Sequence, residues 1–171
     1  LGTDGYRERS GTQARSFFVS GGYAKNKDLL KITAFAGRTN NQLAYLAAPL
    51  SDIQKNPRIN PLTPEETDRF EQDLVQVQYT HRLTNRASLV ASGYYIRLAG
   101  GYNILFSPVL QNFAVDSDFG GGMLSYHFTS QHLTLHTGIH ANTYRRDHFS
   151  AIQPNLSEKL YFNSGYKNEV S

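Results

Sequence analysis

Residues 132–146 read HLTLHTGIHANTYRR, and this stretch decides the fold. Its histidines recur at every fourth position, so on a helix the three imidazoles would share one face, as a metal site requires. The whole stretch, however, alternates in polarity. One parity holds Leu133, Leu135, Thr137, Ile139 and Ala141, and the other holds His132, Thr134, His136, Gly138, His140, Asn142 and Tyr144. A period of two predicts a strand with an apolar face and a polar face.

The strand interpretation removes the local metal site. Residues four positions apart on a strand are separated by about 13 Å, whereas the ligands of a metal ion lie about 2 Å from it. His132, His136 and His140 could bind one ion only with partners from neighbouring strands. We therefore expect no metal site here, and polar residues that face water.

The same alternation recurs elsewhere in the chain. It is found at residues 16–23, 30–37, 75–80, 87–95 and 122–128, and a seventh strand begins near residue 161. These runs exceed the usual strand length of about 5 to 6 residues and approach the 9 to 11 or so that cross a membrane in a β-barrel.

The connections between these strands fall into two classes. Tight turns rich in Asn, Lys and Ser are expected at residues 24–28, 83–86 and 129–131, and long loops at residues 39–70, 98–115 and 147–162. Short and long connections alternate, so all the short ones share one end of the sheet. Short periplasmic turns opposite long extracellular loops are typical of outer-membrane barrels.

The aromatic residues fit the same architecture. Tyr23, Tyr79, Tyr126 and Phe128 precede short turns and belong to the apolar parity, as a girdle at a membrane interface would. The apolar run from Leu133 to Ala141 covers roughly 20 Å of height on a tilted strand, close to the lipid-facing band of about 25 Å in such barrels.

Composition excludes several classes of function. The 171 residues suffice for one domain and contain no Cys, which excludes disulfide, zinc-finger and thiol-nucleophile chemistry. The 17 basic and 14 acidic residues are scattered, so no nucleic-acid partner is expected. We find no calcium loop, phosphate loop or hydrolase motif, and hence expect neither an enzyme nor a cofactor. Both ends of the chain are expected to continue into a longer protein.

The long loop at residues 39–70 carries the candidate binding residues. PLSDIQKNP, residues 49–57, predicts one helical turn that ends before Pro57, and Thr63 to Glu66 has the form of a capping box. Because binding residues concentrate on loops held by a rigid scaffold, we expect ligand contacts in this part of the chain. The candidates are Arg38, Asn41, Gln42, Tyr45 and Arg58.

Several longer phrases resemble a known family. DGYRERSGTQARSFFVSGGY, LLKITAFAGRTNNQLAYLAAP, NPRINPLTPEETDRFEQDLVQVQYTHRL and KLYFNSGYKNEVS resemble barrel strands of TonB-dependent outer-membrane receptors of Bacteroidetes-type bacteria. The resemblance spans essentially the whole chain. It implies that residues 1–171 form a single segment of a transmembrane β-barrel in the outer membrane of a Gram-negative cell.

The resemblance also implies a function. Such receptors import a scarce ligand, an iron chelate, cobalamin or a glycan, through a 22-stranded barrel closed by a plug domain. The expected partners are outer-membrane lipid, the plug, the rest of the barrel, the small-molecule or glycan ligand, and the TonB complex, which is reached through an N-terminal box. The chain carries neither plug nor TonB box, and its seven or so strands could not close the barrel.

Two other interpretations stay open from sequence alone. One is a self-contained soluble β-sandwich or lipocalin-like barrel that binds a small molecule. The other is an outer-membrane hydrolase that pairs Ser125 with His136 on adjacent strands. A closed apolar core would support the sandwich, whereas an outward apolar face with the histidines on the opposite side would support the barrel wall.

Overall fold

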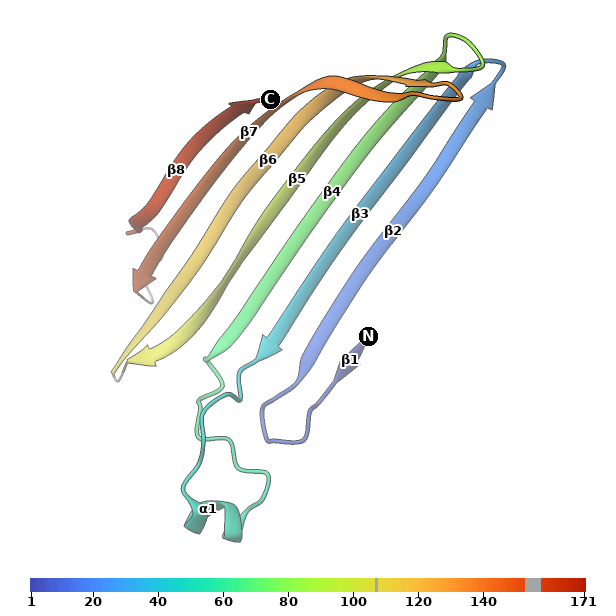
Figure 1. Ribbon diagram of the computed structural model, residues 1–171. Coiled ribbons are helices and arrows are strands. Elements are labelled where there is room, and N and C mark those ends of the chain that lie inside the picture. The colour runs from blue at the N-terminus through green and yellow to red at the C-terminus, as the bar shows by residue number, and fades with distance from the viewer. Residues whose placement is uncertain (107, 153–157) are drawn as a thin grey trace.

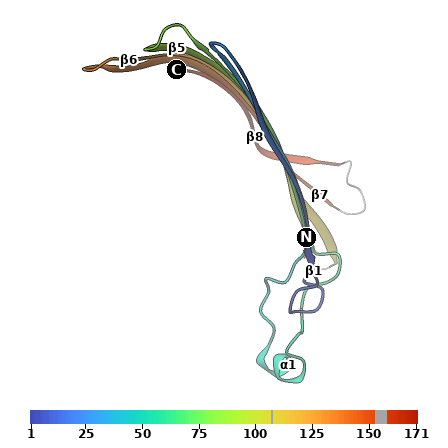
Figure 2. The ribbon, with the colours of Figure 1, turned by 90° about the vertical axis from the view of Figure 1, so that its right-hand side faces the viewer.

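The chain folds into a single curved sheet, face-on in Figure 1 and edge-on in Figure 2. The computed structural model describes residues 1–106, 108–152 and 158–171. The strands are β1 (Gly2–Thr3), β2 (Thr12–Lys25), β3 (Asp28–Gln42), β4 (Thr67–Arg82), β5 (Ala87–Phe106), β6 (Val109–Thr129), β7 (Thr134–Ile152) and β8 (Leu160–Val170). Each pairs antiparallel with the next in sequence. The predicted all-β up-and-down meander is confirmed, with the two-residue β1 as an additional edge strand.

The short turns lie where the sequence predicts them. β2 and β3 are joined by residues 26–27, β4 and β5 by residues 83–86, and β6 and β7 by residues 130–133. Asn26 adopts a φ of 55°, a left-handed conformation that Asn tolerates and that two-residue hairpins need. All three turns gather at the upper end of the sheet in Figure 1.

The expected long loop at residues 98–115 is wrong. β5 continues to Phe106 and β6 begins at Val109, so the two strands extend together far past the apolar region. The expected loop at 147–162 is shorter too, because β7 continues to Ile152 and β8 begins at Leu160; residues 153–157 within it lie outside the described residues. Strands paired along their whole length keep their backbone groups hydrogen-bonded even where the side chains do not alternate in polarity.

The remaining long connection, residues 43–66 between β3 and β4, forms a compact excursion below the sheet (Figure 1). It contains α1 (Leu50–Lys55), the expected helical turn, which ends at Asn56 just before Pro57. Thr63 to Glu66 forms a turn in which the Thr63 amide donates to the Glu66 carboxylate at 2.8 Å, the side-chain half of a capping box without a helix after it.

The register aligns the predicted parities across the whole sheet. Residues directly opposite on paired strands share a face, and Ile32 faces Val77, Ala91 faces Leu124, and Leu124 faces Ile139. We call this side the band face. Its apolar band comprises Phe17, Val19, Tyr23, Leu30, Ile32, Ala34, Ala36, Val75, Val77, Tyr79, Leu89, Ala91, Tyr95, Leu124, Tyr126, Phe128, Leu135, Ile139 and Ala141.

The opposite side, which we call the histidine face, carries His127, His136 and His140 together with Gln, Ser and Thr side chains. An apolar row also crosses this face: Phe18, Phe35, Leu74, Ile96 and Phe119. The separation of these histidines from Leu135 and Ile139 is the arrangement expected of a barrel wall.

The sheet encloses no apolar core. Among the described residues, the buried hydrophobic ones are only Leu62, Val90 and Ala151, while Ile139 is 66% exposed and Tyr23 64% exposed on the band face. A soluble sandwich would bury these side chains against a second layer. β1 and β8 form the two edges of the sheet, which does not close on itself. No helix of the described chain is long and apolar enough to cross a membrane.

Candidate functional site

A belt of charged residues follows the apolar band on the same face, toward the long-loop end. The first row runs across β4 to β7 with alternating sign: Asp73, Arg97, Asp118 and Arg145 face one another in turn. Opposite charges in facing positions stabilise a sheet. The band itself contains no Asp, Glu, Lys or Arg, so the boundary between the two regions is sharp.

The next row of the belt breaks this alternation. Arg15 faces Arg38 across β2 and β3, and Asp116 faces Asp147 across β6 and β7. The acidic pair has basic neighbours, with Arg97 Nε 4.0 Å from Asp116 and Arg145 Nη2 2.6 Å from Asp147.

The arginine pair has one carboxylate. Arg38 Nε lies 3.6 Å from Glu71, and Glu71 also forms an ion pair with Arg69. The belt is therefore basic over β2 to β4 and acidic over β6 and β7.

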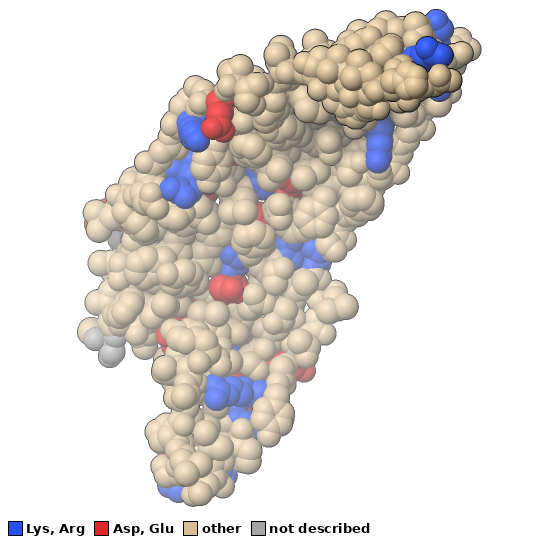
Figure 3. All heavy atoms as spheres, viewed as in Figure 1, with Lys and Arg blue, Asp and Glu red and all other residues tan. Residues whose placement is uncertain are grey.

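The histidine face is less charged near the short turns. On the face seen in Figure 3, acidic and basic side chains mix toward the long-loop end and are sparse over the upper strands.

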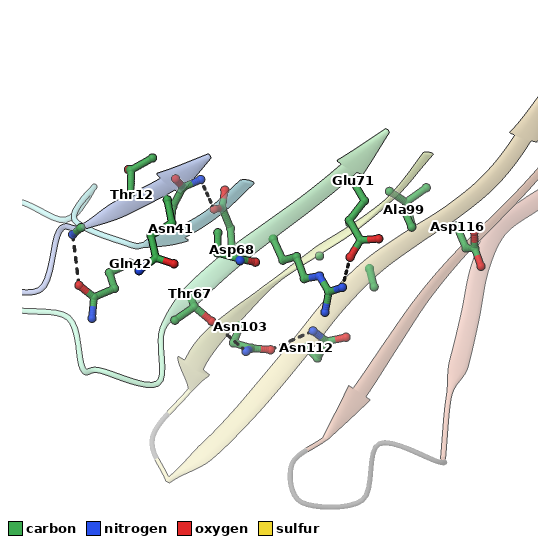
Figure 4. Close-up of a pocket in the computed structure, with 18 of the residues that line it drawn as sticks. Thr12, Asn41, Gln42, Thr67, Asp68, Glu71, Ala99, Asn103, Asn112 and Asp116 are labelled. Carbon is green, nitrogen blue, oxygen red and sulfur yellow. Dashed lines mark hydrogen bonds and ion pairs between the residues drawn. The ribbon is translucent and has the colours of Figure 1, made fainter. Parts of the chain in front are cut away.

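A groove of about 1020 Å³ begins at the belt, where Glu71, Arg97 and Asp116 line it, and extends to the long-loop end (Figure 4). Most of its lining side chains belong to the band face. A row of polar contacts crosses it: Asn112 donates to Asn103 at 2.9 Å, and Asn103 donates to Thr67 at 3.3 Å. Nearby, the Gly11 amide donates to Gln42 at 3.2 Å. The groove is thus lined by amides that can exchange these bonds for contacts with a polar ligand.

The structure disperses the five predicted binding residues around this end of the sheet. Arg38 and Gln42 lie on the band face, and Asn41 lies on the histidine face, where it donates to Asp68 at 2.5 Å. Tyr45 is 61% exposed in the loop. Arg58 donates through Nε to the Tyr6 carbonyl at 2.8 Å. Asn41 and Gln42 line the groove, and the other three do not.

An arginine clamp that sequence reasoning missed holds the long loop. Arg7 donates to the carbonyls of Ala44 and Leu46 at 3.0 and 2.6 Å, and Arg9 to those of Asn60 and Leu62 at 2.8 and 3.0 Å. The partners are backbone oxygens far along the chain, which no residue pattern reveals. The signal available was the unusual density of Arg in YRERSGTQAR, residues 6–15.

Two buried polar side chains also hold the loop at residues 43–66 in place. Asn60 is 3% exposed and donates to the carbonyls of Arg9 and Leu43 at 3.0 and 2.9 Å. Glu66 is 4% exposed and accepts from the Leu105 amide at 3.2 Å, which ties the loop to the end of β5. Asn60 and Glu66 therefore fix the loop, because both buried side chains are hydrogen-bonded, although the buried Thr63 hydroxyl has no such bond among the described residues.

The described residues of the histidine face do not pair Ser125 with His136. His127 and His136 stack with their ring centroids 4.4 Å apart, and Ser125 contacts His127 at 3.0 Å instead of His136. His140 contacts the Tyr94 hydroxyl at 2.9 Å. In the described part of the chain, no three His, Asp or Glu side chains gather as metal ligands would.

Asp28 marks the opposite boundary of the band, beside the two-residue turn. Its carboxylate accepts a hydrogen bond from Tyr79 at 2.5 Å and contacts His81 Nδ1 at 2.7 Å. These bonds, that of Tyr79 first, lower the pKa of Asp28 because they favour its charged form.

Comparison with known proteins supports the fold. No family model and no curated protein matches the sequence. Among solved structures, the chain is similar to the ferric citrate transporter FecA in its unliganded form, with a TM-score of 0.74, 11% identity and coverage of 96% of this chain and 26% of that one. It is also similar to BauA, the ferric preacinetobactin receptor from Acinetobacter baumannii, with a TM-score of 0.63, 11% identity and coverage of 96% and 28%.

The two neighbours are TonB-dependent receptors of the outer membrane, and neither is an enzyme. The chain spans about a quarter of their length. Identity this low relates folds alone, and the similarity covers nearly all of this chain. The chain has the fold of a wall section of a TonB-dependent receptor barrel.

Proposed function

We propose that the chain is part of an outer-membrane receptor that imports a scarce ligand with energy from the TonB complex. The strands form the wall, and the long-loop end faces the medium and helps to gather the ligand. A plug domain and the rest of the barrel are the partners that such a wall section needs. Ligand capture is non-covalent, and this segment contributes no bond-making chemistry.

The observation that carries the proposal is the division of one sheet into two faces. An exposed band free of charge, bounded by tyrosines near the short turns and by a charged belt toward the long loops, fits a lipid bilayer. The opposite face carries histidine, Gln, Ser and Thr side chains near the short turns, as the water-filled interior of a transport barrel does. It also carries one apolar row across β2 to β6: Phe18, Phe35, Leu74, Ile96 and Phe119. The two structural neighbours are a ferric citrate transporter and a ferric preacinetobactin receptor, which favours an iron chelate over cobalamin or a glycan.

We further propose Asn41, Gln42, Tyr45 and Arg58 as ligand-contacting residues. Of these residues, Tyr45 is the best-supported candidate, because its ring is exposed on a loop that the arginine clamp holds in place. Arg38 shares the face of the apolar band, and we assign it a different role below.

The test measures uptake by cells that depend on the intact protein, with iron-55 supplied as ferric citrate or as a ferric siderophore, and cobalt-57 as cobalamin. Replacing residues 43–66 by a short linker should abolish uptake of one of these ligands and leave the protein in the outer membrane. Tyr45→Ala should weaken uptake of that ligand several-fold, whereas the control Lys55→Ala, at the end of α1 in the same loop, should not. Unchanged uptake of every ligand after loop replacement would contradict the role of the loop.

A further inference from the structure

The facing pair Arg15 and Arg38 is the least compensated charge arrangement on the sheet. Like charges in directly opposed positions of an antiparallel pair are destabilising. Both side chains are exposed. Among the described residues, Arg15 has no ion pair or side-chain hydrogen bond, and Arg38 shares Glu71 with Arg69. Two arginines thus share one carboxylate, and Arg15 pairs with none in the described part of the sheet.

The position of the pair relative to the band identifies what it meets. Phe17 and Ala36 form the last row of the band on β2 and β3, and Arg15 and Arg38 form the row after it. One row is two residues, or about 7 Å along the strand. The headgroup region on each side of a bilayer begins at the edge of the hydrocarbon and is roughly 5 to 8 Å deep. Side chains one row past the band therefore lie among lipid headgroups.

We propose that Arg15 and Arg38 form a binding site for the phosphate of a phosphorylated lipid in the outer leaflet. The inference rests on the proposed function, which places the band in the outer membrane with the long-loop end outward. Guanidinium groups bind phosphate oxygens through paired, charge-assisted hydrogen bonds, and a doubly charged phosphate between the two arginines would remove their repulsion. Glu71 holds Arg38 from the side away from Arg15 and so leaves the space between the arginines to the phosphate.

The test uses the intact barrel purified in detergent and measures lipid binding by native mass spectrometry. The probes are diphosphorylated lipid A and the same lipid after removal of its phosphates. The Arg15→Gln/Arg38→Gln variant should bind diphosphorylated lipid A at least about tenfold more weakly than wild type, since each lost contact is a hydrogen bond between charged groups. Both proteins should bind the dephosphorylated lipid equally.

Arg97→Gln is the matched control, because Arg97 lies in the same belt but faces Asp73 and Asp118 and has Asp116 at 4.0 Å. It should change lipid binding by less than about twofold. Equal losses in both variants, no loss in the double variant, or displacement of the lipid by inorganic phosphate at the same concentration would each overturn the lipid site.

Folding is checked separately by heat-dependent gel mobility. Should the double variant not fold, Arg15→Gln, which leaves the ion pair of Arg38 with Glu71 intact, carries the test with an expected loss of about threefold. If the wild-type protein is not a folded barrel of the outer membrane, the proposed function fails. If it is, and the variants bind phosphorylated lipid as wild type does, only the lipid site fails.

Discussion

Gly121 shows how tightly the histidine face is packed at the scale of one residue. The Tyr94 ring reaches across β6 to contact His140, and a Cβ added at Gly121 would lie 2.6 Å from the Tyr94 hydroxyl and 2.7 Å from the Ala141 carbonyl oxygen. The backbone contact cannot be relieved by a rotamer change. Gly121→Ala should therefore lower the free energy of unfolding by roughly 1 to 3 kcal/mol, the usual cost of overpacking.

The matched control is Gly21→Ala, since a Cβ at Gly21 meets nothing within 4 Å. Denaturant unfolding of the intact protein in detergent, followed by circular dichroism, compares the two variants. Gly21→Ala should leave stability within about 0.5 kcal/mol of wild type. A loss for Gly21→Ala as large as that for Gly121→Ala would contradict the packing described here.

At the scale of elements, the arginine clamp sets the conformation of the loop between β3 and β4. Arg9→Gln removes a charged donor from the carbonyls of Asn60 and Leu62. Hydrogen bonds from charged donors contribute about 1.5 to 3 kcal/mol, so amide hydrogen exchange in residues 43–66 should accelerate at least about tenfold. Exchange in β3 and β4 should not change. Lys55→Gln in the same loop is the control, and loop protection equal in wild type and Arg9→Gln would show that the clamp is dispensable.

The sequence could predict only those strands and loops that a local pattern of polar and apolar residues encodes. Alternation around Ile32, Val77 and Ile139 predicted the strands and their faces, because a sheet with two unlike faces requires a period of two. Arg38 lies two residues after Ala36, so the same alternation also predicts that Arg38 lies on the band face. The long ends of β5 and β6 were not predicted, because Gly100 and Gly101 resemble a turn and the residues after them do not alternate in polarity. Strand pairing holds these ends in the sheet.

At the scale of the whole molecule, the described sheet has two unlike faces and does not enclose an apolar core. The strands from β2 to β7 share one face that carries the apolar band, and pairing along the full length satisfies the backbone. The candidate site follows from this arrangement. Where the apolar band ends, the same face becomes charged. At that end of the sheet, Arg7 and Arg9 anchor the loop at residues 43–66.

This division predicts opposite responses to the same substitution at adjacent positions of β4. Val77 lies on the band face opposite Ile32, and Gln76 lies on the histidine face opposite Thr33. Val77→Lys places a charge in hydrocarbon and should lower the free energy of unfolding in phospholipid vesicles by about 2 to 4 kcal/mol. Gln76→Lys places it in water and should change stability by no more than about 0.5 kcal/mol. Similar losses for the two variants would mean that both faces have the same surroundings, and the membrane placement of the band would be wrong.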